Sequence, residues 1–191
     1  MLTHYFELRA IPQVDLTEVT VMNEFLKSSH KLLIYYDGEI GISFPCYTRK
    51  QNKTLGGIIR YFGQKDSLST LRNELSNQSI IMDYGIVLEI KKIPEKVSNY
   101  IGLRRVRQKG QSALKRAEKR LSIQGKWSLE IKEKMIEKWG AGKLGYPHCH
   151  LISSSTGQSF IMWIKQEYYN EHRPGKFNSY GMSTNSTVPN F

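Results

Sequence analysis

The sequence has few of the features that define secreted and membrane proteins. Its 191 residues include two cysteines, Cys46 and Cys149, too few for the disulfide framework of a small secreted domain and compatible with a reducing compartment. No apolar run approaches the roughly 20 residues that a membrane-spanning helix requires. The first residues, MLTHYFELRA, carry neither a basic start nor a continuous apolar stretch. We therefore expect no secretory signal, no membrane partner and a cytoplasmic location.

Several enzyme motifs are also missing. The sequence contains no glycine-rich phosphate loop, nucleophile elbow or HExxH pair. Its one compact group of metal-ligand residue types is His148-Cys149-His150, where a strand would point both histidines to the same face. Zinc usually requires three or four protein ligands, so we expect no metal and no cofactor. A metal site at His148 and His150 stays open as an alternative to simple strand packing.

Positive charge is abundant and concentrated in one segment. The chain has 28 Lys or Arg and 17 Asp or Glu, a formal net charge of +11. Residues 91–146 hold 16 Lys or Arg and 5 Asp or Glu, so this segment carries the whole excess. A local excess of this kind is typical of a surface that binds a polyanion. Nucleic acid is the first candidate, an anionic membrane surface the second, and a merely solvated face the third.

The densest part of this segment is QSALKRAEKRL, residues 111–121, which has the spacing of an amphipathic helix. Four cations share one face of that helix, and small or apolar residues share the other: Lys115, Arg116, Lys119 and Arg120 against Leu114, Ala117 and Leu121. A helix that binds a membrane surface needs a broader apolar face with aromatic residues. The pattern therefore favours nucleic acid.

The order of predicted elements indicates the fold. Strand-like segments at 4–11, 40–45, 55–63 and 80–93 are separated by helical patterns at 16–36 and 68–75. This β-α-β-β-α-β order matches the ferredoxin-like motif of RNA-recognition-motif domains, although the stacking aromatics of those domains are absent in their usual form.

The segment after Pro94 has a different character. We expect an irregular basic stretch at 104–111, the basic helix, an amphipathic helix at 127–140 and strands at 148–153 and 159–169. The aromatic residues spaced along the C-terminal tail indicate that part of it is tied down. The predicted fold class is thus α+β, with a ferredoxin-like domain at 1–97 and an RNA-binding region at 98–191 that holds the basic helix and a small β unit.

Two segments could carry chemistry if a nucleic acid lies nearby. His30 sits in KSSHKLL, where a surface or half-buried histidine without a catalytic role is the simpler interpretation. An imidazole of ordinary pKa, about 6.5, can nevertheless transfer protons at neutral pH, as cleavage of RNA through its own 2′-hydroxyl requires. SSSTGQSF, residues 153–160, is either a hairpin turn or a polar cradle for sugars and phosphates, and its composition does not separate the two.

Together these segments resemble the CRISPR-associated endoribonucleases of type I-F systems, which trim precursor CRISPR RNA into guides. The segments HYFELR, SSHKLL, IGISFP, the basic helix, SSSTGQSF and SYGMS followed by VPNF occur in the same order and at similar spacing. The resemblance covers nearly the whole chain. Its most specific anchors are IGISFP, STGQ followed two residues later by a phenylalanine, and SYG near the C-terminus.

The resemblance implies three catalytic residues. His30 falls on the histidine that transfers a proton while the ribose 2′-hydroxyl attacks the adjacent phosphate. Ser153 falls on the serine that holds that hydroxyl, with Ser154 and Ser155 as alternatives because the three serines are adjacent. Tyr180 falls on the tyrosine that orients the histidine.

The resemblance also implies an RNA-binding surface. Its residues are Arg105, Arg107, Gln108, Lys109, Lys115, Arg116, Lys119, Arg120, Ser155, Thr156 and Phe160. Arg105 corresponds to a base-reading arginine, either Arg107 or Gln108 to its polar partner, and Phe160 to a base-stacking aromatic. The basic helix here contains two lysines and Glu118, and lysine attracts phosphate without the two-pronged hydrogen bonding of arginine.

The substrate implied by the resemblance is the repeat hairpin of precursor CRISPR RNA. The expected reaction is metal-independent cleavage at the 3′ base of the hairpin, with the enzyme staying bound to its product alongside other subunits of a CRISPR surveillance complex. Three alternatives remain open: a non-catalytic hairpin-binding subunit of a ribonucleoprotein, a metal-dependent nuclease built on His148 and His150, and a general basic nucleic-acid binder.

Overall fold

The computed structural model describes residues 2–191 except 12, 15, 108–110, 141–144 and 154–155, and it describes no side chains at 111, 112 and 138–140. The chain forms two compact units. The first comprises Met1–Arg105 together with Tyr146–Phe191, and the second is Val106–Gly145. Residue 97, where we expect the boundary between two domains, lies inside the first unit, and the expected division of the chain stays a prediction.

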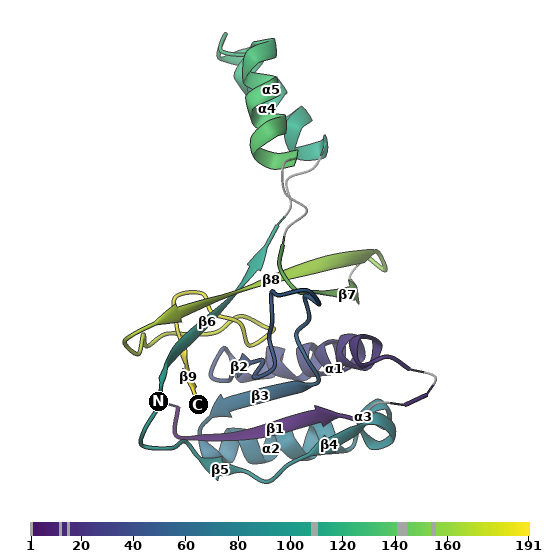
Figure 1. Ribbon diagram of the computed structural model, residues 1–191, viewed down its shortest axis with the longest axis vertical. Coiled ribbons are helices and arrows are strands. Elements are labelled where there is room, and N and C mark those ends of the chain that lie inside the picture. The colour runs from purple at the N-terminus through teal and green to yellow at the C-terminus, as the bar shows by residue number, and fades with distance from the viewer. Residues whose placement is uncertain (1, 12, 15, 108–110, 141–144, 154–155) are drawn as a thin grey trace. The chain divides into compact units, whose positions relative to one another are not determined.

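The first unit begins with an antiparallel sheet. Its strands are β1 (His4–Ala10), β2 (Gly41–Ser43), β3 (Ile58–Gly63), β4 (Gly85–Val87) and β5 (Lys91–Lys92). The strand order is β2-β3-β1-β4, and β5 also pairs with β1 (Figure 1). This is the strand order of the ferredoxin-like motif, so the predicted α+β class and ferredoxin-like arrangement are confirmed.

Helices cover this sheet because their apolar residues recur at helical spacing. The helices are α1 (Glu18–Leu33), continued by the 3₁₀ turn η1 (Ile34–Tyr36), α2 (Lys65–Ser76) and α3 (Ser79–Tyr84). The side chain of Thr17 caps α1 by accepting a hydrogen bond from the Thr20 N–H. Phe25 of α1 is fully buried in a core that also contains the stacked rings of Phe6 and Tyr61, whose centroids are 4.8 Å apart.

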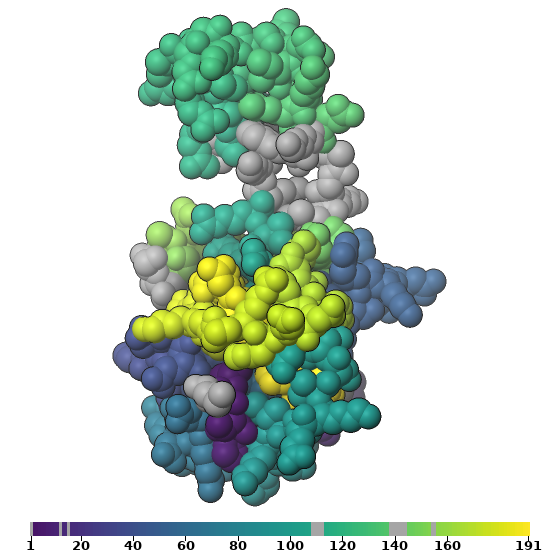
Figure 2. All heavy atoms as spheres, turned by 90° about the vertical axis from the view of Figure 1, so that its left-hand side faces the viewer, coloured from purple at the N-terminus to yellow at the C-terminus, as the bar shows by residue number. Residues whose placement is uncertain are grey.

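A second antiparallel sheet joins the middle of the chain to its C-terminal part. It comprises β6 (Asn99–Val106), β7 (His148–Ile152), β8 (Ser159–Tyr169) and β9 (Val188–Asn190), in the order β7-β8-β6-β9. Strand β7 contacts α1, and β9 pairs with β6. The C-terminal residues thereby complete the second sheet, and their yellow and yellow-green spheres lie across the face shown in Figure 2.

Aromatic residues fix the tail, as expected from their spacing. Phe177 is buried in the core. The ring of Phe191 makes an edge contact with that of Tyr5, at a centroid distance of 4.9 Å, and the Phe191 carbonyl accepts a 2.8 Å hydrogen bond from Arg60. These contacts hold the tail against the first sheet.

The second unit contains two helices that contact each other, α4 (Gln111–Ile123) and α5 (Leu129–Gly140). Helix α4 ends in a Schellman motif, in which the Lys126 N–H donates to Leu121 O and the Gly125 N–H donates to Ser122 O. Gly125 has a φ of +64°, the left-handed conformation that this motif requires. Both basic and amphipathic helices are therefore present as predicted.

Two local predictions were wrong. Residues 80–93 do not form one strand, because 79–84 are α3 and the strands β4 and β5 follow. The apolar run IIM suits a short helix as well as a strand, and in the helix Ile81 is buried while Met82 is exposed. The stretch 104–111 is not irregular throughout, since β6 extends to Val106 and α4 begins at Gln111.

Candidate active site

His30 of α1 lies against the C-terminal tail. Its Nδ1 is 2.8 Å from the carbonyl oxygen of Ser179. Its ring is stacked on that of Tyr180, with the centroids 3.8 Å apart and the planes within 5° of parallel. Because a carbonyl oxygen accepts and cannot donate, Nδ1 is the donor. The other ring nitrogen, Nε2, is then the one left to exchange a proton with a substrate.

Tyr180 stays a neutral phenol near neutral pH. Burial raises the pKa of the Tyr180 hydroxyl, the positive charge of Arg105 opposes this rise, and Cys149 adds to it. A neutral ring stacked on an imidazole restricts its rotation without adding charge. The geometry thus suits an orienting role for Tyr180.

Arg105 and Phe160 lie together in the same unit. The guanidinium carbon of Arg105 is 4.9 Å from the centroid of the Phe160 ring, within the range of a cation–π contact. Arg105 is exposed at the end of β6, and Phe160 is half-buried near the start of β8. The charge of Arg105 also lowers the pKa of the Tyr180 hydroxyl, which links Arg105 electrostatically to the His30–Tyr180 pair.

Ser153 begins the turn between β7 and β8. Its N–H donates to Gln158 O at 2.9 Å, its carbonyl accepts from the Gly157 N–H at 2.9 Å, and its Oγ accepts from the Thr156 N–H at 3.3 Å. The segment is a hairpin turn with the exposed Thr156 at its bend. Two of the predicted serines, Ser154 and Ser155, lie outside the described residues.

The cations of α4 are all on its exposed side. Lys115, Arg116, Lys119 and Arg120 are exposed, whereas Leu114 and Ala117 on the opposite face are 7% and 6% exposed. Arg107 is exposed as well. The other two expected contacts of this stretch, Gln108 and Lys109, lie outside the described residues. The second unit therefore presents a compact positive face of the kind that binds phosphates.

The HCH motif lies on β7, where His148 and His150 share one face of the strand and Cys149 lies on the other. The rings of His148 and His150 are 5.3 Å apart, and His148 also packs on Trp163 at 4.4 Å. Burial lowers the pKa of His148, and the charge of His150 lowers it further. In the described part of the chain, no group of three His, Cys, Asp or Glu is placed to hold a metal ion. The two histidines are arranged as neighbours on one face of a strand, which agrees with the interpretation of the motif as strand packing.

Cys149 points the other way along β7, into the core. It is 1% exposed, and burial raises the pKa of its thiol to about 12. A thiol with this pKa is protonated at neutral pH and does not act as a nucleophile.

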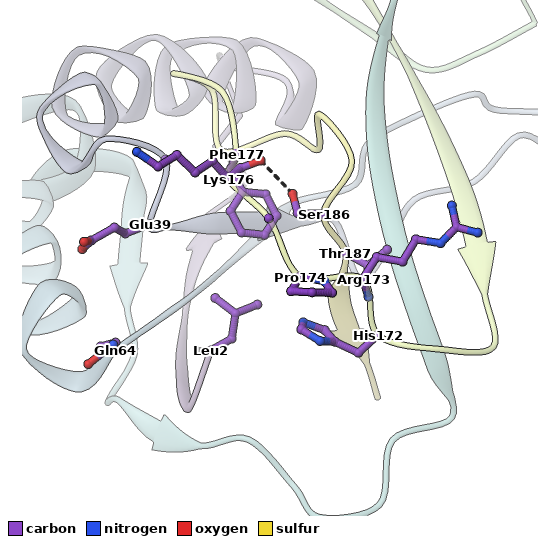
Figure 3. A pocket seen from close by; sticks show the side chains of 12 residues that line it. Leu2, Glu39, Gln64, His172, Arg173, Pro174, Lys176, Phe177, Ser186 and Thr187 are labelled. Carbon is purple, nitrogen blue, oxygen red and sulfur yellow. Dashed lines mark hydrogen bonds between the residues drawn. The ribbon is translucent and has the colours of Figure 1, made fainter.

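A separate cavity of about 220 Å³ lies beneath the tail segment that precedes this site. Figure 3 shows Phe177 at the cavity and the long side chains of Arg173 and Lys176 extending away from it. Arg173 instead packs on the Tyr169 ring at 4.1 Å, and Lys176 pairs with Asp37. The charged ends of both side chains are thus engaged outside the cavity.

Sequence reasoning missed two residues next to the site, Asn178 and Ser179. Ser179 acts through its backbone carbonyl, which residue type does not reveal. Asn178 precedes a Ser-Tyr-Gly sequence, and an asparagine before a glycine-containing segment is typical of a tight turn. That signal could have located the turn, but not its contact with His30.

No helix among the described residues is long and apolar enough to cross a membrane. The fold and the site together define an α+β protein with a ferredoxin-like sheet, a histidine-centred site and a strongly basic helix. Such a combination suits a protein that binds and processes nucleic acid.

The chain belongs to the Cas_Csy4 family, because the family model described as CRISPR-associated protein (Cas_Csy4) matches residues 5–191. Two relatives are named CRISPR-associated endonuclease Cas6/Csy4. The one from Escherichia coli (strain UTI89 / UPEC) is 26% identical over 98% of this chain and 99% of its own. The one from Pseudomonas aeruginosa (strain UCBPP-PA14) is 29% identical over the same shares. The protein is therefore an endonuclease of CRISPR RNA processing, as predicted.

Proposed function

We propose that this endonuclease binds the repeat hairpin of precursor CRISPR RNA and cuts at the 3′ base of the hairpin without a metal ion. The observation that carries this proposal is the pairing of His30 with the tail, through the Ser179 carbonyl and the Tyr180 ring. A histidine that is held on one ring nitrogen can transfer a proton through the other. The proposal assigns that proton transfer to the ribose 2′-hydroxyl.

The reaction needs no covalent enzyme intermediate. The 2′-oxygen forms a bond to the adjacent phosphorus, and the bond from phosphorus to the 5′-oxygen breaks. The products are a cyclic 2′,3′-phosphate and a free 5′-hydroxyl, so the proton lost from the 2′-oxygen is balanced by one gained at the leaving oxygen. His30 takes part in this transfer, Ser153 holds the 2′-hydroxyl, and Tyr180 orients the imidazole.

RNA binding is assigned to three groups of side chains. The exposed cations of α4, Lys115, Arg116, Lys119 and Arg120, bind phosphates of the hairpin stem. Arg105 reads a base and Phe160 stacks on one, and the guanidinium carbon of Arg105 is 4.9 Å from the centroid of the Phe160 ring. Arg107, Gln108, Lys109, Ser155 and Thr156 complete the predicted surface by contacts to bases, phosphates and sugars.

The many phosphate contacts expected of such a surface favour slow release of the product. We therefore propose that the enzyme stays on its cleaved RNA and joins other subunits of a CRISPR surveillance complex in the cytoplasm. The two free cysteines, Cys46 and Cys149, suit that compartment.

The decisive experiment compares cleavage of a repeat hairpin by the wild-type protein and by His30→Ala. Loss of general acid–base catalysis typically slows a reaction by about 10²- to 10⁴-fold, and hairpin affinity should be retained. His172→Ala is a matched control, because His172 is exposed and its ring contacts Tyr100. A hairpin with a 2′-deoxy substitution at the scissile nucleotide should bind and stay intact.

The same assay separates the rival functions. A non-catalytic hairpin-binding subunit would bind the hairpin and leave it uncut in every arm. A metal-dependent nuclease at His148 and His150 would lose activity in excess chelator, whereas the proposed enzyme retains it. Cleavage by His30→Ala at the wild-type rate would remove His30 from the mechanism.

A further inference from the structure

The turn that carries Ser179 and Tyr180 is organised by a single side chain. Asn178 Oδ1 accepts hydrogen bonds from the Tyr180 N–H at 2.8 Å and from the Met182 N–H at 3.2 Å. The Asn178 carbonyl also accepts from the Gly181 N–H at 2.8 Å, and the Asn178 N–H donates to Met182 O at 2.9 Å. One asparagine thus takes part in four hydrogen bonds across this turn, two of them through its side-chain oxygen.

The turn is also attached to the ferredoxin-like sheet. The Ile42 N–H of β2 donates to Gly181 O at 2.9 Å. Gly181 has a φ of +71°, and a Cβ at this position would lie 2.7 Å from the Ile42 side chain. Glycine is therefore the residue that fits this left-handed position without a clash. The hydrogen bonds of Asn178 hold the other end of the same turn.

Both contacts that fix His30 come from consecutive residues of this turn. The Ser179 carbonyl receives the Nδ1–H, and the Tyr180 ring covers the face of the imidazole. In a neutral histidine, the hydrogen bond made by one ring nitrogen decides which nitrogen carries the proton. The position of the Ser179 carbonyl therefore sets the tautomer of His30, and Asn178 sets the position of that carbonyl.

We propose that Asn178 is a positioning residue for cleavage: through the turn at 178–182 it holds neutral His30 as the Nδ1–H tautomer and keeps Nε2 available for proton transfer. The inference rests on the proposed function, because it assumes that His30 transfers the proton. Asn178 itself touches neither the RNA nor the reacting atoms in this account. Its effect on the rate is exerted through the orientation of the imidazole.

The direct test is the tautomer of His30 in the wild-type protein. With ¹⁵N-labelled histidine, NMR distinguishes a protonated ring nitrogen from an unprotonated one by its chemical shift and its couplings to ring protons. We expect Nδ1 to be the protonated nitrogen when the imidazole is neutral. A neutral His30 that carries its proton on Nε2 would overturn the inference without any variant.

Two substitutions then test the role of the side chain. Asn178→Ala removes the oxygen that accepts both hydrogen bonds, so we expect mixed tautomers at His30 and single-turnover cleavage slower by about 10- to 100-fold, as for a small misplacement of a catalytic group. Hairpin affinity should change by less than about twofold. Asn178→Asp keeps an oxygen acceptor in the same place and should restore the Nδ1–H tautomer.

Asn190→Ala is the matched control. Asn190 is also half-buried in the tail, and its side chain donates one 3.0 Å hydrogen bond to Asn99. This variant should keep both the tautomer and the cleavage rate. If Asn178→Ala folds and retains the wild-type tautomer and rate, Asn178 has no positioning role. If Asn178→Ala does not fold, an Asn178→Asp protein with mixed tautomers at His30 overturns the inference instead.

Failure of this inference is distinguishable from failure of the proposed function. An active His30→Ala protein would refute the proposed function. An inactive His30→Ala protein combined with an unaffected Asn178→Ala protein would refute the positioning role alone.

Discussion

Neutralising the basic face of α4 should weaken the salt dependence of hairpin binding by a calculable amount. The four exposed cations of that face are Lys115, Arg116, Lys119 and Arg120. Each phosphate contact contributes about 0.7 to 0.9 to the slope of log affinity against log salt concentration. Replacing all four by glutamine should therefore reduce the slope by about 3.

That change in slope corresponds to a large difference in affinity. Over a fourfold rise in salt, from about 50 to about 200 mM, four contacts account for about a 50- to 150-fold loss of affinity. The wild-type protein should lose this much more affinity than the glutamine variant across the same range. Fluorescence anisotropy with a labelled hairpin would measure it, using the 2′-deoxy substrate so that cleavage does not interfere.

A second variant with the same charge change distinguishes the effect of the α4 face on hairpin binding from the effect of net charge. Four exposed lysines of the first unit that lie outside residues 91–146, Lys50, Lys53, Lys65 and Lys176, serve as the control set when replaced by glutamine. They are remote in sequence from α4, and the resemblance assigns none of them to RNA, so their loss should leave the slope nearly unchanged. Equal reductions in the two variants would refute a specific role for the α4 face and favour a general basic nucleic-acid binder.

Two further predictions concern the stability of the first unit. Burial alone would raise the pKa of Glu7, but hydrogen bonds and charges from Arg9 and Arg60 lower it overall. The ionised Glu7 therefore stabilises the folded protein at neutral pH, and this contribution is lost as the pH falls through the lowered pKa. Glu7→Gln should therefore reduce the free energy of unfolding at pH 7 by about 3 kcal/mol and flatten its acid dependence, measured by urea denaturation; an unchanged acid limb would contradict this. Gly181→Ala should lower the thermal unfolding temperature more than Gly157→Ala does. Both glycines have positive φ, but an added Cβ would lie 2.7 Å from the Ile42 side chain at Gly181 and would meet nothing within 4 Å at Gly157. Equal decreases in the unfolding temperature would mean that the tail shifts to accommodate the methyl group.

The basic helix illustrates what local sequence can predict. Helical periodicity is a property of residues three and four apart, so the spacing of Leu114, Ala117 and the cations between them defined both faces of α4. Burial of Leu114 and Ala117 bears this out. The same local reasoning failed at 79–84, where a short apolar run fits a helix and a strand equally well.

The arrangement around His30 shows where such reasoning ends. The resemblance assigned a role to Tyr180, but the Ser179 carbonyl lies 149 positions from His30 in the chain, and no periodicity connects residues so far apart. Their meeting depends on the pairing of β9 with β6 and on the packing of Phe177 and Phe191. Asn178 becomes relevant only once that turn has been placed beside the helix.

The sequence alone determined the α+β class, the match to the ferredoxin-like motif and the basic face of α4, because each follows from spacings within one element or from the order of elements along the chain. Tertiary structure alone decided which nitrogen of His30 is held by a backbone carbonyl. That choice depends on the position of one backbone carbonyl, and a carbonyl is placed by the long-range packing of the chain rather than by the type of residue that carries it.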